Sequence, residues 1–165
     1  MADQSRTRAG DARAKTIVIL AAAAVAALSA CSPKEPTMTP HESRDQTIRV
    51  VHETQKLLSA GPWRVDLGAY PEECTLSDGS TGVSYADAES AEPTADHIGD
   101  ANRIADYWKT LGMSVRVVTQ NPTAYATGGP LKGASFSTSP GLYSIEASST
   151  CVPGNAANLL GELSG

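Results

Sequence analysis

Two segments of the chain repeat apolar residues at the spacing of an amphipathic helix. In residues 40–60 and again in residues 94–111, apolar positions fall on one half of the helical cylinder and charged positions on the other. Thr39 and Glu42 form the Thr-x-x-Glu pattern of a capping box, and Pro40 between them suits the first helical position. The sequence therefore predicts two helices, the first of which begins at Pro40.

Other segments alternate apolar and polar residues, which is typical of strands with one buried face. Strands are expected at 63–70, 82–86, 113–119, 134–138 and 142–151, with a further candidate at 123–127. In the first strand, Trp63, Val65 and Leu67 share the face that is expected to be buried. Pro71 is expected to end this strand, and the acidic segment 87–93 is expected to be irregular.

The order of these elements predicts an α+β fold. Each helix has one apolar stripe, the clearest strands have one apolar face, and short links join the last strands. These features favour a two-layer sandwich, in which a mainly antiparallel sheet has both helices on one face. The expected domain covers residues 40–152. Residues 153–165 are a tail that either forms a turn or two of helix or is disordered.

Residues 1–30 have the parts of a bacterial secretory signal. Four basic residues precede eleven uncharged, mostly aliphatic residues at 17–27. This apolar run is too short to span a bilayer comfortably, because a spanning helix needs roughly 20 apolar residues. The segment is therefore expected to direct export and then to be removed.

The sequence Leu28-Ser29-Ala30-Cys31 directly follows the apolar run and resembles the lipobox of bacterial prolipoproteins. Small residues before the cysteine allow a signal peptidase to cut there, and the Cys31 thiol can be alkylated with a diacylglyceryl group, with palmitate among its acyl chains. The resemblance implies a lipidated Cys31, a flexible tether over residues 31–39, and a domain on the extracytoplasmic face of the cell membrane. The alternatives are a non-lipidated signal peptide and a short uncleaved anchor.

The charge balance argues against nucleic acid and anionic lipid as partners. The whole chain has a net charge of −5 and the leader contributes +2, so the mature chain would have −7. Nucleic-acid phosphates and anionic headgroups both require a basic surface. The lipid on Cys31 is therefore expected to hold the protein at the membrane without electrostatic help.

The remaining cysteines form an even pair in an oxidising compartment. With Cys31 assigned to lipid, Cys74 and Cys151 are expected to form one disulfide bond, and the alternative is two free thiols. Tyr143 and Ile145 mark the buried face of the last predicted strand. Alternation places Cys151 on that same face, so the cysteine is expected to point inward.

Candidate catalytic and metal-binding residues are few. His97 with Asp96 and Asp100 could form the corner of a metal site, but carboxylates at a helix start are commoner as capping charges. His52 begins a segment like a zinc-protease helix, yet Lys56 occupies the position of the second ligand. The sequence therefore predicts no metal, no cofactor and no enzymatic activity.

A looser pattern runs through the mature part of the chain. Its residues are Trp63, Gly68, Pro71, Cys74, Leu76, Asp78, Gly79 and the late Cys151-Val152-Pro153-Gly154. This pattern resembles small uncharacterised lipoproteins of high-GC Gram-positive bacteria. The resemblance supports the lipoprotein class and the disulfide bond, and it implies no mechanism.

Three functions are compatible with these features. The leading hypothesis is a non-enzymatic, lipid-anchored domain that binds a protein partner at the outer face of the cell membrane. The alternative is a carrier of a lipid or transport substrate, which would need a large apolar cavity between sheet and helices. The third is a hydrolase, which would need a serine hydroxyl beside His52 or His97 in a cleft.

The predicted partner-binding surface is the sheet face turned away from the helices. Alternation assigns to it Arg64, Asp66, Tyr70, Arg116, Ser144, Glu146 and Ser148. These mostly polar side chains would be costly to bury without partners, and an antiparallel sheet can keep one face in water. The alternative is that this face is merely a solvated surface.

Overall fold

The computed structural model describes residues 38–162, so the predicted lipidation site Cys31 lies outside the described residues. Within this range the chain forms an α+β fold with three helices and one seven-stranded antiparallel sheet. The helices are α1 (Pro40–Gln55), α2 (His97–Thr110) and α3 (Ala156–Glu162). The strands are β1 (Arg64–Thr75), β2 (Thr81–Ala91), β3 (Ser114–Val118), β4 (Thr123–Gly128), β5 (Leu131–Ser139), β6 (Leu142–Ser148) and β7 (Val152–Pro153). None of the helices in residues 38–162 is long and apolar enough to cross a membrane.

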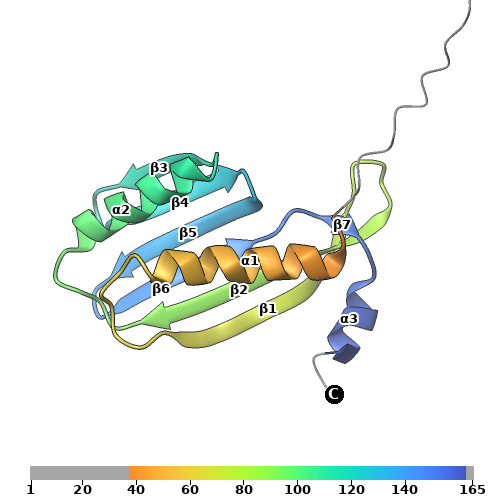
Figure 1. Cartoon of the computed structure of the whole chain (residues 1–165), viewed down its shortest axis with the longest axis horizontal. Helices are drawn as coiled ribbons and strands as arrows, with labels where there is room; N and C mark the ends of the chain where they lie inside the picture. Colours follow the sequence, from red (N-terminus) through yellow and green to blue (C-terminus); the bar gives the residue numbers. More distant parts are fainter. Residues whose placement is uncertain (1–37, 163–165) are drawn as a thin grey trace, which may run out of the picture. The chain divides into compact units, whose positions relative to one another are not determined.

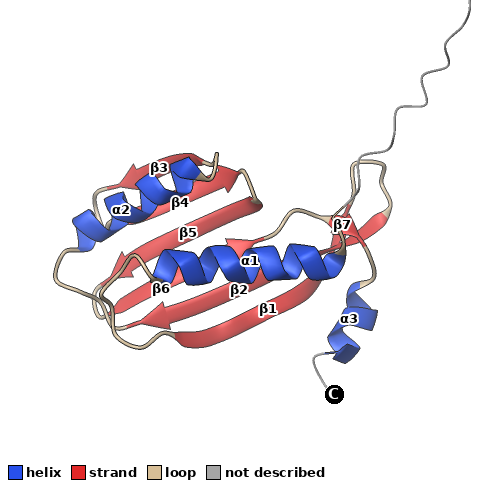
Figure 2. Cartoon of the chain, viewed as in Figure 1, coloured by secondary structure: helices blue, strands red, loops and turns tan. Residues whose placement is uncertain are grey.

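The sheet has the strand order β1-β2-β6-β5-β4-β3, and β7 pairs with the start of β2. All paired strands are antiparallel. Figures 1 and 2 show that α1 and α2 lie on the same face of the sheet, α1 along β2 and β6 and α2 along β3, β4 and β5. The predicted two-layer sandwich is therefore confirmed, and its second layer is confined to one face.

The start of α1 agrees with the predicted capping box. The backbone N–H of Glu42 donates to Thr39 Oγ1 at 3.3 Å, and the backbone N–H of Thr39 donates to Glu42 Oε2 at 2.8 Å. Two donors that the first helical turn would leave unsatisfied are thus paired. This reciprocal pair fixes the point at which the chain enters the domain.

The buried side of α1 is more polar than the predicted apolar stripe. Ser43, Thr47 and Thr54 are buried together with Val50 and Val51. The hydroxyl groups of Thr47 and Thr54 each donate to the carbonyl oxygen four residues earlier, at 2.9 and 2.7 Å. The threonines are satisfied within the helix, so they can face the core at little cost.

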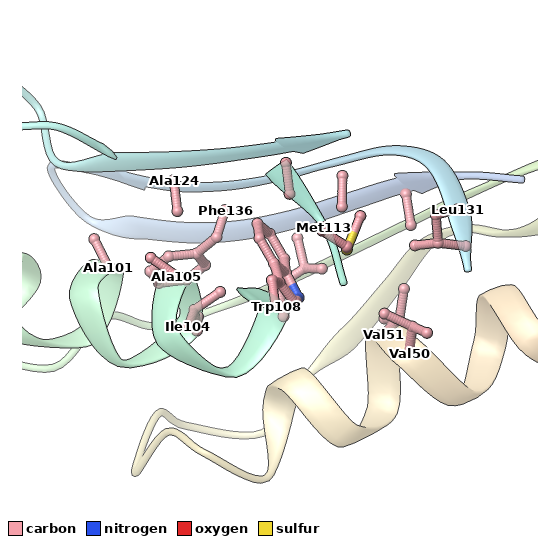
Figure 3. Packing of buried hydrophobic residues seen from close by; sticks show 14 of the residues in the cluster. Val50, Val51, Ala101, Ile104, Ala105, Trp108, Met113, Ala124, Leu131 and Phe136 are labelled. Carbon is pink, nitrogen blue, oxygen red and sulfur yellow. The ribbon is translucent and has the colours of Figure 1, made fainter. Parts of the chain in front are cut away.

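The core between helices and sheet is centred on Trp108 of α2, which is fully buried. Its neighbours in one hydrophobic cluster include Ile104 of the same helix and Phe136 of β5. Figure 3 shows Trp108 between α2 and the sheet, with Val50 and Val51 of α1 pointing toward Leu131. Both helices therefore bury their apolar side chains in a single core.

The second strand is longer than predicted. It extends to Ala91 and includes Asp87 and Glu89, which the sequence analysis had assigned to an irregular acidic segment. In β2 these two residues share the helix-facing side with Val83 and Tyr85, and all four are buried. The prediction was wrong because the two carboxylates interrupt the apolar alternation of the strand. The fold nevertheless buries both of them.

The first strand departs from simple alternation. Its pairing with β2 shifts between Val65 and Leu67 and again between Leu67 and Tyr70. Extra residues in a bulge turn the following side chains to the other face. Leu67 therefore lies opposite Ala88 on the side away from the helices, and Val65 is 65% exposed. The predicted burial of these two residues was wrong.

Pro71 does not end β1, which continues to Thr75. β1 pairs only with β2 and is an edge strand, so the missing N–H of proline costs no hydrogen bond within the sheet. Cys74 consequently lies in a strand rather than in a loop. Its register partner on β2 is Gly82.

The disulfide bond joins Cys74 to Cys151, with their Cα atoms 6.0 Å apart, and its prediction is confirmed. β6 ends at Ser148, so Cys151 lies beyond the strand and the predicted inward orientation was wrong. A Cβ atom on Gly82 would lie 2.7 Å from the sulfur of Cys151 and 2.6 Å from the carbonyl oxygen of Val152. The bond therefore crosses directly over Gly82, away from the helices.

Gly82→Ala is expected to lower the free energy of unfolding by about 1 to 3 kcal/mol, because the added methyl group overlaps backbone and disulfide atoms. Gly133→Ala is the matched control, since a Cβ atom there would meet its nearest neighbours at 3.6 and 3.8 Å. Urea unfolding of the two variants measures the difference. Equal stabilities would contradict the proposed close approach at Gly82.

Candidate functional site

We call the sheet surface turned away from α1 and α2 the helix-free face. α3 lies on the same side of the sheet as α1 and α2, because its Leu159 packs with Val83 and Tyr85. None of the helices in the described part of the chain therefore covers the helix-free face. Any function of this surface has to come from the side chains that alternate away from the core.

A concavity of about 490 Å³ lies on the helix-free face across β2, β6 and β5, and we call it the sheet groove. Its floor is formed by small residues, among them Ala86, Ala88, Gly133 and Ser135. Glu146 is the charged residue of β6 within it. Because the floor has almost no side-chain bulk, a partner can approach close to the backbone of three neighbouring strands.

The register of the sheet places the groove residues in one row that crosses the strands. From β1 to β3 this row is Leu67, Ala88, Glu146, Ser135, Tyr125 and Arg116. Leu67 and Tyr125 are 39% and 42% exposed although both are large and apolar. Leu67 lines the groove and forms its rim at β1, and Tyr125, which stands beside Ser135 one strand beyond the lining residues, forms the second rim.

Aromatic and basic groups meet at the β3 side of this row. The guanidinium carbon of Arg116 lies 4.7 Å from the centroid of the Tyr125 ring, which is within the range of a cation–π contact. Tyr70 of β1 is exposed at the opposite side of the sheet. Tyrosine and arginine are enriched at protein interfaces, and here they flank the groove.

Six of the seven residues predicted to form a partner-binding surface lie on the helix-free face, Ser144 and Ser148 of β6 among them. Arg64 is opposite Ser90, and its Nη2 atom donates to Ser90 Oγ at 3.5 Å. Tyr70 belongs to the same face, as do Arg116 and Glu146 in the row described above. Alternation therefore placed these residues correctly; their role in binding remains a prediction.

Asp66 is the exception, because it lies in the bulge of β1. It lines a second concavity of about 510 Å³ together with Arg44 and Ile48 of α1. Leu67 and Tyr70 of the helix-free face line the same crevice. Asp66 has no register partner on β2, so its predicted position on the helix-free face stays a prediction.

Sequence reasoning missed Leu67 and Tyr125 as candidate site residues. The sequence did contain a signal for Tyr125. Ala124 and Ala126 on either side of it are small and buried, and alternation places Tyr125 on the opposite face of the sheet. No such signal existed for Leu67. An apolar residue in an alternating strand is assigned to the core unless the bulge is known in advance.

Two acidic side chains are buried on the helix-facing side of β2. Asp87 and Glu89 are 3% and 5% exposed. Glu89 accepts a hydrogen bond from Gln55 Nε2 at 2.6 Å and lies 3.4 Å from His52 Nε2. Asp87 Oδ1 is buried and has no hydrogen-bond partner among the described residues.

Burial and, as the second cause, the negative charge of Glu89 raise the pKa of Asp87 from 3.8 to about 6. The charge of His52 and the backbone N–H of Ala88 act in the opposite direction and offset only part of this effect. Glu89 has two polar neighbours, whereas Asp87 has an unsatisfied oxygen. Loss of the Asp87 proton beneath α1 is therefore expected to lower the stability of the fold as pH rises.

The residues that could have formed a metal corner have separate roles. Asp96 caps α2 by accepting a hydrogen bond from the backbone N–H of Gly99 at 3.1 Å. Asp100 is buried and accepts a hydrogen bond from Tyr143 Oη at 2.8 Å, and His97 packs edge-on against the Tyr143 ring. In residues 38–162, no three His, Cys, Asp or Glu side chains come together in a way that could hold a metal ion.

Asp87→Asn is expected to increase the free energy of unfolding at pH 7.5 by up to about 3 kcal/mol. The folded protein holds the Asp87 proton up to about pH 6, whereas the unfolded chain releases it near pH 3.8. The stability of the unsubstituted protein should therefore fall as pH rises through this window, and the variant should lose less. Urea unfolding from pH 4 to 8 tests this, with the exposed Asp66→Asn as control. Identical pH profiles of the Asp87 variant and the unsubstituted protein would contradict it.

Comparisons with known proteins add little to this description. No model of a known protein family matches the chain, and no curated protein matches it in sequence. Among solved structures, a DUF4853 family protein from Actinomyces odontolyticus is similar, with a TM-score of 0.46 and 18% sequence identity. The similarity covers 69% of this chain and 64% of that protein, so the chain spans less than two thirds of its length. A similarity of this size carries no argument about function.

Proposed function

We propose that this protein is a lipid-anchored, non-enzymatic extracytoplasmic domain that binds a protein partner through its helix-free face. The observation that supports this most directly is the sheet groove, a concavity of about 490 Å³ that Leu67 lines at one side and that ends one strand short of Tyr125. Leu67 and Tyr125 expose apolar surface on both sides of a small-residue floor. Exposed apolar surface that is gathered around a concavity marks an interaction site more often than scattered apolar residues do.

The proposed anchor is close in sequence to the start of α1. Eight residue steps separate Cys31 from the helix cap Thr39, so the lipid lies at most about 28 Å from the start of α1. Figure 1 shows that this end of α1 lies at the same end of the sheet as β7 and the β1–β2 connection. The tether would therefore join the domain at its disulfide end.

The alternative of a small-ligand carrier requires a cavity between sheet and helices. Trp108, Phe136 and Tyr143 are fully buried in that space. The sheet groove and the crevice beside Asp66 both open at the surface instead. No observation favours a carrier over a protein-binding domain.

A hydrolase requires a serine beside a histidine. His52 lies against the Glu89 carboxylate, and His97 lies against the Tyr143 ring. These contacts are on the helix side of the sheet, away from the groove. In residues 38–162 no hydrogen bond joins a serine hydroxyl to either histidine, so the nucleophile–base pair that a hydrolase needs has no support here.

The anchoring part of the proposal predicts a change in location. Cys31→Ser removes the sulfur that would receive the lipid, so the full-length variant should move from the membrane pellet to the medium or soluble fraction. Fractionation of cells that express either protein measures this. A variant that stays in the pellet and resists extraction with high salt would show that the leader itself is the anchor.

The binding part predicts a contact that is specific to one face. A photoreactive residue in place of Ser144, on the helix-free face beside the groove, should give a protein adduct of defined mass in intact cells. The same residue in place of Thr110, which is exposed on α2, is the control and should not give this adduct.

Ser135→Tyr fills the groove floor without changing charge, so it should reduce the Ser144 adduct at least about tenfold. A melting temperature close to that of the unsubstituted protein would show that the variant is folded. An adduct that survives this substitution in a folded protein would contradict docking in the groove. An adduct with lipid in place of protein would favour the carrier.

A further inference from the structure

We propose that the element seated in the sheet groove is an amphipathic helix of the partner, and that a lysine or arginine within its apolar stripe pairs with Glu146. This inference rests on the proposed function, since it names the chemistry of the partner at the same site. It follows from three properties of the groove: the hydrogen bonding available on a sheet face, the width between the rims, and the charge on the floor.

A sheet face offers a partner no backbone hydrogen bonds, because the N–H and C=O groups of β2, β5 and β6 are engaged with their neighbouring strands. An extended segment laid on this face would bury its own backbone groups without partners, at a cost of about 1 to 3 kcal/mol for each group. A helix satisfies its backbone internally. The face therefore favours a helix over a strand.

The distance between the two rim residues also fits one helix. Leu67 on β1 and Tyr125 on β4 are separated by four strand spacings, which is about 19 Å between backbones. A helix with its side chains is about 10 to 12 Å across. One helix can therefore lie over the small residues of β2, β6 and β5 while the two rim side chains cover its flanks.

The charge on the floor determines what the helix must present. Glu146 lies between Ala88 and Ser135, and no ion pair in residues 38–162 includes it. Arg116 lies three strand spacings away, about 14 Å, and stacks on Tyr125. A wholly apolar stripe would bury the Glu146 carboxylate without a partner, which is costly. A basic side chain at this position removes that penalty and fixes the register of the helix.

The experiment uses the full-length protein in cells, with the photoreactive residue in place of Ser144 as the probe. Glu146→Gln keeps the shape of the side chain and removes its charge, so the adduct should fall about tenfold or more. Glu72→Gln is the matched control, because Glu72 lies opposite Ser84 on the same face, outside the groove, and its loss should change the adduct less than about twofold. Mass spectrometry of the adduct then identifies the captured segment of the partner.

The captured segment should have apolar residues at helical spacing and a lysine or arginine among them. Replacing that residue by glutamate should abolish the adduct with the unsubstituted protein and restore it with Glu146→Lys. An adduct that Ser135→Tyr abolishes but Glu146→Gln leaves unchanged would overturn this inference while the proposed function stands. A captured segment with strand-like alternation, or with no basic residue, would also overturn it. If neither substitution lowers the adduct, or if no protein adduct forms, the inference and the proposed function both fail.

Discussion

The indole ring of Trp108 joins both long helices to the sheet. It is fully buried in the core and belongs to α2, and its Nε1 atom donates to Thr54 Oγ1 of α1 at 3.0 Å. The same hydroxyl donates to the carbonyl oxygen of Val50, so the indole N–H is paired in the core at no cost to α1. Because α1 and α2 share this one side chain, both must pack on the same face of the sheet. The opposite face is left without a helix of the described chain over it.

The two faces of the sheet differ in side-chain size, and this difference supports the proposed function. The helix-facing side has large side chains such as Phe136, Tyr143 and Ile145, which fill the core. The helix-free side of the same strands has mainly alanine, serine and glycine, and Glu146 is the charged side chain of β6 on that side. A face that needs only to meet water has no requirement for a small-residue floor between apolar rims. A face that receives a partner gains from it, because small residues allow close packing.

Alternation alone places most of the candidate site. Arg64, Tyr70, Arg116 and Glu146 lie on the helix-free face because successive side chains of a strand point to opposite sides. The rule fails in β1, where the bulge at Asp66 turns Leu67 outward. A bulge depends on how an edge strand fits its one neighbour, and the neighbour of β1 is known only once β1 and β2 are paired.

The sequence by itself determined where α1 begins, through the Thr39–Glu42 capping box, because both partners lie within one turn of helix. It also determined the two-layer class and the pairing of Cys74 with Cys151, since the periodicities and the even cysteine pair need no knowledge of strand order. Only the tertiary structure decided that Asp87 would be buried in β2 and that the disulfide would cross Gly82. These features arise from contacts between residues far apart in the chain, which local patterns do not encode.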